Sequence, residues 1–126
     1  MNKSDYIKKF NNLVTSLLSQ LSPIIGSKHY RNYNLFIKVN SMIGLDHFLE
    51  YMYPLKNKII KKDESYFINC ELPDELKKDK IILDEILRLK DIYYQVDNKS
   101  KESLWIYLQS MLGIAEEYYI LTNNLN

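Results

Sequence analysis

The sequence predicts an all-α protein, a single-domain helical bundle of about five helices. Three observations support this prediction. Apolar residues recur at spacings of three and four along most of the chain, as they do in amphipathic helices. Only three glycines and three prolines interrupt the chain, and they fall where this spacing breaks. The 126 residues are 46% hydrophobic and can bury one core, so we expect a single domain over residues 1–126.

The first expected helix runs from about Asp5 to Leu21, with Ser4 as its N-cap. Pro23 should stop this helix, because proline lacks the amide hydrogen that a continuing helix needs. A second helix should follow the linker 24–27 and end at Gly44, which we place at the C′ position. The apolar face of the first helix consists of Tyr6, Phe10, Leu13, Leu17 and Leu21.

A third helix is expected to begin near Asp46, whose carboxylate can cap the first turn. Pro54 should break it, and the chain should restart as a helix over 55–62. In that restart, Leu55, Ile59 and Ile60 are expected to face the core. Residues 63–64 are acidic and predict a further helix start. The segment 66–70 is the best candidate for a strand, and we assign it to this helix.

The C-terminal part predicts an antiparallel helical hairpin. Leu72 and Pro73 signal a helix start, and apolar residues then recur at helical spacing up to Tyr94. A polar turn over 95–99 leads to a last helix, from about Ser100 to Leu121. Two long amphipathic helices joined by a short turn normally pack side by side. The inner stripe of the last helix consists of Leu104, Trp105, Leu108, Met111, Leu112, Ala115, Tyr118 and Tyr119.

Charge is unevenly distributed along the chain, although the net charge is only +1. Residues 1–63 hold ten Lys or Arg and four Asp or Glu, whereas residues 64–126 hold seven and twelve. Three explanations are open: the two halves attract each other within the fold, two copies meet head to tail, or a basic face binds an acidic partner.

The residues needed for standard enzyme chemistry are missing or isolated. His29 and His47 are best explained as surface or half-buried side chains, and Cys70 has no second cysteine with which to hold zinc. His47 and Glu50 run in the opposite order to the Glu-x-x-His motif of di-iron bundles. The isolated glycines form no phosphate-binding loop. We therefore expect no catalytic, cofactor-binding or metal-binding residues, no cofactor, and a protein that is not an enzyme.

A lysine segment offers one candidate binding surface. Its four lysines lie near Tyr51 and Tyr53, and they could neutralise phosphates while the rings stack on bases. Lysines on the wet side of an amphipathic helix are more often only solvated, and the acidic second half opposes long-range attraction of an anion. The candidate contacts for an anionic partner are Lys56, Lys58, Lys61 and Lys62.

Tyrosines offer a second candidate surface. Eleven tyrosines are more than a small core can easily bury with their hydroxyls satisfied, so several should reach the surface as interface anchors or as a core rim. Homodimerisation through the last helix is the simplest form of such an interaction, and the alternative is a monomer in which the first helix closes the bundle. The candidate interface residues are Ala115, Tyr118, Tyr119 and Tyr107.

No apolar stretch approaches the roughly 20 residues of a membrane span, and the N-terminus lacks a signal-peptide pattern. A single cysteine agrees with a reducing compartment. We therefore expect no membrane span and a cytoplasmic protein.

Two segments resemble small helical proteins of nucleocytoplasmic large DNA viruses. The segment Pro54–Phe67 is similar to a recurrent stretch of proline, spaced isoleucines and Asp-Glu-x-aromatic-Phe. The segment Leu104–Met111 is similar to the Trp-x-x-Leu helix that often closes such proteins. The resemblance implies a giant-virus origin, with a place in the host cytoplasm or the virion, and it brings no catalytic or binding residue with it.

The sequence as a whole favours a non-enzymatic protein-interaction module, with a virion or viral-factory component as the role that the resemblance implies. Its partner would be another protein or a second copy of the chain. The alternative is a nucleic-acid-associated factor that uses the lysine-rich helical segment.

Overall fold

The computed structural model describes residues 1–69, 91 and 93–124, and these residues form helices and turns with no strand among them. The predicted all-α class is confirmed. The predicted C-terminal hairpin and the total number of helices depend on residues 70–90, which lie outside the described residues.

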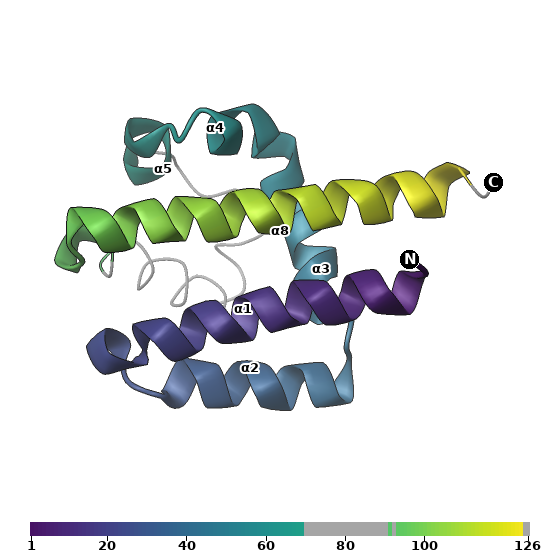
Figure 1. Ribbon diagram of the computed structural model, residues 1–126, viewed down its shortest axis with the longest axis horizontal. Coiled ribbons are helices and arrows are strands. Elements are labelled where there is room, and N and C mark those ends of the chain that lie inside the picture. The colour runs from purple at the N-terminus through teal and green to yellow at the C-terminus, as the bar shows by residue number, and fades with distance from the viewer. Residues whose placement is uncertain (70–90, 92, 125–126) are drawn as a thin grey trace.

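Three helices run along the long axis of the molecule (Figure 1). They are α1 (Lys3–Ile25), α2 (Lys28–Val39) and α8 (Asn98–Asn124). Helix α1 lies between the other two and runs antiparallel to both. The first and last helices of the chain are therefore direct neighbours.

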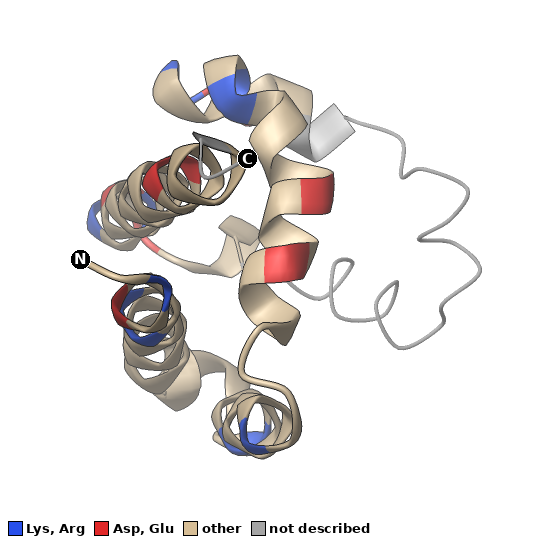
Figure 2. Cartoon of the chain, turned by 90° about the vertical axis from the view of Figure 1, so that its right-hand side faces the viewer, with Lys and Arg blue, Asp and Glu red and all other residues tan. Residues whose placement is uncertain are grey.

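The chain between α2 and residue 69, which we call the crossing segment, crosses one side of the α1–α8 pair (Figure 2). It begins as α3 (Ile43–His47), continues as the π-helix η1 (Phe48–Met52) and the 3-10 turn η2 (Tyr53–Leu55), and becomes α4 (Lys56–Ile60). The short helix α5 (Glu64–Asn69) follows. The predicted break at Pro54 appears here as a change of helix type, since proline cannot donate an amide hydrogen bond and its ring crowds the carbonyl four residues back.

Both ends of α1 differ from the prediction. The N-cap is Asn2 rather than Ser4, since the Asn2 side chain accepts from the Asp5 amide at 3.0 Å and the Asp5 carboxylate accepts from the Asn2 amide at 3.2 Å. Pro23 lies inside the helix, which continues to Ile25. The Ser22 hydroxyl donates to the Ser19 carbonyl at 2.6 Å and so satisfies the acceptor that proline leaves without its usual donor.

Gly44 was predicted to end the second helix, and this prediction is wrong. Helix α2 ends at Val39, and Gly44 lies within α3. A β-carbon at Gly44 would collide with the Tyr33 hydroxyl, which donates to Asn11 Oδ1 at 2.8 Å. The Asn11 amide in turn donates to the Ser41 carbonyl at 2.9 Å. Glycine is needed at position 44 because this polar contact between α1 and α2 occupies the space of a side chain.

Several smaller boundaries also shift. Helix α3 begins at Ile43, so Asp46 lies in its first turn and does not cap it. Helix α8 begins two residues before Ser100, whose amide donates to the Asp97 carboxylate at 2.7 Å. Ile60, which was expected to face the core, is 55% exposed. The predicted start at residues 63–64 is confirmed, since α5 begins at Glu64.

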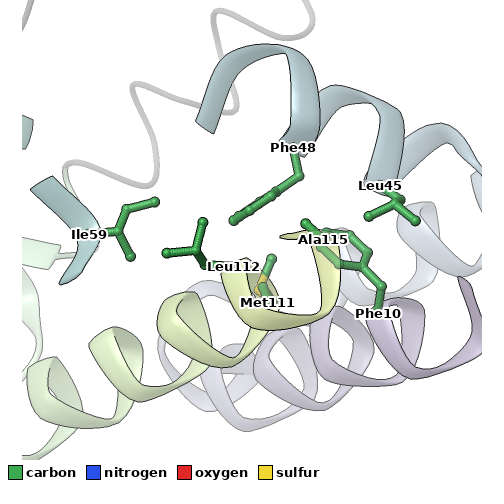
Figure 3. Packing of buried hydrophobic residues seen from close by; sticks show 7 residues of the cluster. All are labelled: Phe10, Leu45, Phe48, Ile59, Met111, Leu112 and Ala115. Carbon is green, nitrogen blue, oxygen red and sulfur yellow. The ribbon is translucent and has the colours of Figure 1, made fainter. Parts of the chain in front are cut away.

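The main core is formed where α1, α8 and the crossing segment meet (Figure 3). The rings of Phe10 and Phe48 pack edge to face, with centroids 5.4 Å apart. A second cluster around Leu21 and Val96 closes the far end of the α1–α8 pair. The buried residues of the main core are Phe10, Leu45, Phe48, Ile59, Met111, Leu112 and Ala115.

The predicted inner face of the last helix is largely confirmed. Trp105 is buried, as expected, and its indole nitrogen donates to the Tyr93 hydroxyl at 3.3 Å. Leu108 is only partly buried, although it packs against the main core. Leu112 lies deeper and contributes more buried apolar surface.

Truncation of the core should separate these positions. We expect Leu112→Ala to lower the free energy of unfolding by about 2 to 5 kcal/mol, because it leaves a cavity in the main core. Leu108→Ala should cost less, and Ile106→Ala, on the exposed side of the same helix, should change stability by only about 0.5 kcal/mol. Urea denaturation measures all three. A larger loss for Ile106→Ala than for Leu112→Ala would contradict the orientation of α8.

Tyr33 predicts a specific dependence of stability on alkaline pH. Burial raises the pKa of its phenol from 10.0 to about 12. Between these values the unfolded chain loses the proton while the folded chain keeps it, so the contribution of Tyr33 to stability should fall as pH rises through this window. Tyr33→Phe should be less stable than the parent at pH 8, since Asn11 loses a donor, and the gap should narrow above pH 10. Urea denaturation across this range tests the effect, with Tyr94→Phe at an exposed ring as the control. A gap of constant size would contradict it.

Candidate interaction surfaces

The lysine segment forms ion pairs with carboxylates of the same chain. The Nζ atom of Lys56 lies 3.4 Å from Glu116 Oε2, and that of Lys58 lies 3.4 Å from Asp63 Oδ2. The Nζ atom of Lys62 lies 2.9 Å from Glu102 Oε2. Lys61 is exposed and forms no ion pair with a described residue. Three of the four lysines predicted to contact an anionic partner are thus partly neutralised within the fold. These pairs are at least one-third exposed at the lysine, so each contributes little to stability.

Two of these ion pairs connect the basic first half of the chain to the acidic second half. Lys56–Glu116 and Lys62–Glu102 both join α4, or the turn after it, to α8. Gln109 supports the same contact, because its amide donates to the Ile59 and Ile60 carbonyls at 3.3 Å. Attraction between the halves within the fold therefore accounts for part of the charge asymmetry.

The third pair belongs to a helix cap. Asp63 accepts from the Tyr66 amide at 3.1 Å, and this hydrogen bond lowers the pKa of the Asp63 carboxyl below its ordinary value. The Lys58 ammonium lies 4.9 Å from the centre of the Tyr66 ring. Lys58 is thus positioned between a cap and a ring, which limits its availability to an external phosphate.

The tyrosine surface predicted on α8 is divided between the core and its rim. Ala115 has no exposed surface and packs with Phe10 in the main core, which corrects the expectation that it lies at an interface. Tyr118 packs against the same core, and its hydroxyl points to the Met42 sulfur at 3.8 Å. Burial, and to a smaller extent Asp46, raises the pKa of the Tyr118 phenol. Helix α1 and the crossing segment cover this end of α8, which explains why these residues are not free.

Tyr107 and Tyr119 contact neighbouring elements on opposite sides of α8. The Tyr107 hydroxyl lies 2.8 Å from that of Ser16 and accepts from the Gln20 amide at 2.6 Å, which ties α8 to α1. The Tyr119 ring stacks on Tyr53 with centroids 5.6 Å apart and remains 47% exposed. The four predicted interface residues therefore do not gather into one surface.

The solvent side of α8 carries a different set of residues, which we call the α8 outer stripe. They are spaced by four, three, four and three, so they lie on one face of the helix. In the end-on view of Figure 2, the crossing segment covers one side of the α1–α8 pair, and no described helix covers the other. The α8 outer stripe consists of Ile106, Ser110, Gly113, Glu117 and Ile120, all of them exposed.

A shallow groove of about 410 Å³ runs beside the stripe, between α1 and α8. Helix α1 contributes Lys9, Asn12 and Leu13 to it, and α8 contributes Ser110 and Ile114. Near one end, burial and the neighbouring Glu117 carboxylate raise the pKa of the Tyr6 phenol. The groove thus has one basic and two apolar side chains in its lining, and Glu117 lies one turn after Ile114 on α8.

Helix α2 presents a second exposed surface, the α2 apolar face, formed by Leu35, Phe36 and Val39. Val39 is 91% exposed, and Leu35 lies one turn before it on the same side. Lys28 and Arg31 precede Leu35 by two turns and one turn, and α2 contains no acidic residue. This surface therefore combines large apolar side chains with positive charge.

The residues considered for metal binding do not form a site among the described residues. His29 is buried in α2, whereas His47 is exposed and its ring lies 6.1 Å from that of Tyr51. Cys70 lies outside the described residues. No group of three or more potential ligands lies close together in the described part of the chain.

None of the described helices is both long and apolar enough to cross a membrane. The two longest, α1 and α8, carry charged and polar residues on their outer faces.

Neither exposed apolar surface is predicted by the sequence pattern. Tyrosine is the predicted signal of an interface, whereas the α8 outer stripe is marked by isoleucines on the side opposite the inner stripe. On α2, Leu35 and Val39 were readable as a pair one turn apart on a face that also carries Lys28 and Arg31.

No family model, no curated protein and no solved structure matches the chain.

Proposed function

We propose that the chain is a non-enzymatic protein-interaction module. The observation that carries this proposal is the α2 apolar face, where three large apolar side chains are exposed together on one short helix. Single exposed apolar residues are common, but a contiguous group with a charged border is typical of a contact surface.

The charges around this face indicate the kind of partner. Lys28 and Arg31 extend the face toward the N-terminus of α2, and Lys38 lies near its other end. An apolar surface bordered by carboxylates, such as one side of an acidic amphipathic helix, would complement it in both respects. The proposed partner is a protein of that chemistry.

The setting of this interaction is part of the same proposal. The resemblance of Pro54–Phe67 and Leu104–Met111 to small helical proteins of nucleocytoplasmic large DNA viruses supports a role in the virion or the viral factory, in host cytoplasm. A structural or assembly role of this kind needs no catalytic centre.

Capture from an extract of the producing cells tests the proposal. The full chain serves as bait, beside the variant Leu35→Gln/Val39→Gln, which should remain folded because both side chains are exposed. We expect specific proteins to be retained by the parent and lost by the variant. Ile24→Gln, which replaces an exposed isoleucine at the end of α1, is the matched control and should retain them.

The retained protein is then purified and titrated against the chain directly. Leu35→Gln/Val39→Gln should weaken binding by about tenfold or more. Lys28→Ala should weaken it most at low salt, because the bordering charges act through screened attraction. Equal retention by all baits would contradict a role for the α2 apolar face.

The alternative function, nucleic-acid association through the lysine segment, has a separate test. Since Lys56, Lys58 and Lys62 already pair with carboxylates, we expect replacement of all four lysines by alanine to leave duplex and single-strand binding unchanged. Fluorescence anisotropy across a salt series measures this. A steep loss of affinity with salt in the parent, abolished in the variant, would establish the alternative instead.

A further inference from the structure

The α8 outer stripe is symmetrical about a glycine. Ile106 lies seven residues before Gly113 and Ile120 seven residues after it, on the same outward face. Seven residues are close to two helical turns, about 10 Å along the axis. The isoleucines are 57% and 48% exposed. The stripe therefore has an apolar side chain toward each end and a gap at its centre.

Packing against the described residues does not require glycine at position 113. A β-carbon there would have no heavy atom of these residues within 4 Å, and the backbone is not left-handed. Glycine inside a helix is less favourable than alanine, because it has more conformational freedom to lose. The missing side chain thus opens space on the outside of the molecule, where another backbone can come close.

We propose that the α8 outer stripe is the contact surface between two copies of this chain, paired antiparallel about a two-fold axis beside Gly113. In such a pair, a residue at a given distance before Gly113 faces the residue at the same distance after it in the second copy. Ile106 of each copy then faces Ile120 of the other. The two glycines meet at the axis, where no side chain separates the helices.

Charge also favours a second copy. Glu117 lies one turn after Gly113, so in the antiparallel pair Glu117 of the second copy comes beside Ser110, one turn before Gly113. Lys9 of α1 lines the groove at that place and forms no ion pair with a described residue. The two-fold axis places both α1 helices on the same side of the α8 pair. Lys9 of each copy therefore faces the Glu117 carboxylate of the other copy, so this contact occurs twice in the dimer.

This dimer uses a different surface from the α2 apolar face, so it goes beyond the proposed function and does not depend on it. Loss of partner capture is read on α2 variants, whereas self-association is read as a mass on α8 variants. The failure of one proposal is thus distinguishable from the failure of the other.

Sedimentation equilibrium of the full chain, from about 5 µM to about 500 µM, measures self-association in the range expected for a small interface. We expect the mean mass to rise from 15.1 kDa toward twice that value. Ile106→Lys should weaken the dimer at least tenfold, since a charge then faces an isoleucine. Adding Ile120→Glu to it should restore the dimer, because each new lysine then faces a new carboxylate. In a parallel pair, like charges would meet, and the double variant would stay monomeric.

Gly113→Gln should change the stability of the monomer and the strength of self-association in opposite directions. In the monomer the new side chain has open space, so the melting temperature at low concentration should rise by roughly 1 to 4 °C. In the dimer the same side chain keeps the helices apart, so self-association should fall at least tenfold. Val39→Lys on α2 is the matched control and should leave the mass unchanged.

Three results would overturn the proposal. They are a monomer mass for the parent at every concentration, a dimer that survives both Ile106→Lys and Gly113→Gln, and a dimer abolished by Val39→Lys. A double variant Ile106→Lys/Ile120→Glu that remains monomeric would overturn the antiparallel arrangement.

Discussion

The rest of the described structure depends on the contact between the first and last helices. Helix α1 packs along α8 over most of its length, and the small side chain of Ala115 lies in the core beside Phe10 (Figure 3). Polar contacts also join the two helices, since the Tyr107 hydroxyl of α8 hydrogen-bonds to Ser16 and Gln20 of α1. The two helices are far apart in sequence, so their contacts close a large loop of the chain. Closing that loop costs conformational entropy. Burial of a shared apolar core offsets that cost.

The crossing segment is irregular because of this pairing. It must reach from α2 across the α1–α8 pair to α4 while keeping Leu45, Phe48 and Ile59 pointed at the same core. A regular α-helix through Pro54 would lose a hydrogen bond. The chain instead widens to a π-turn over 48–52 and tightens to a 3-10 turn over 53–55, and these changes adjust which side chains face inward.

Helical periodicity was sufficient to predict the class and most of the described helices. The inner stripe of the last helix was recognisable because Trp105, Met111 and Leu112 recur on one face, and all three are buried. What periodicity could not provide was the effect of side chains on the backbone. Pro23 stays helical because Ser22 replaces a lost donor, and Gly44 is required by a hydroxyl from another helix. Both effects depend on three-dimensional contacts that local sequence rules do not include.

The candidate surfaces were harder to predict for a related reason. Tyrosines at the margin of an apolar stripe can serve an interface or complete a core rim, and only packing decides between these roles. Here Tyr118 points to Met42, and Tyr53 stacks on Tyr119, so rings from distant segments cover one another. The lysine segment was recognised correctly as a wet helix face, but the carboxylates that pair with it lie up to sixty residues away.

Gly44 and Gly113 each carry the energetic cost of a glycine in a helix, and the contact that compensates for this cost can lie inside or outside the molecule. At each position glycine is less favourable in a helix than alanine, by about 0.5 to 1 kcal/mol. For Gly44 the compensating contact is inside the molecule, where the Tyr33 hydroxyl fills the position of a β-carbon. For Gly113 the described structure contains no such contact. Isoleucines exposed at equal distances on either side add a second unfavourable feature to the same helix face. Both features become favourable together when another helix lies against that face, because it covers the isoleucines and uses the open space at the glycine.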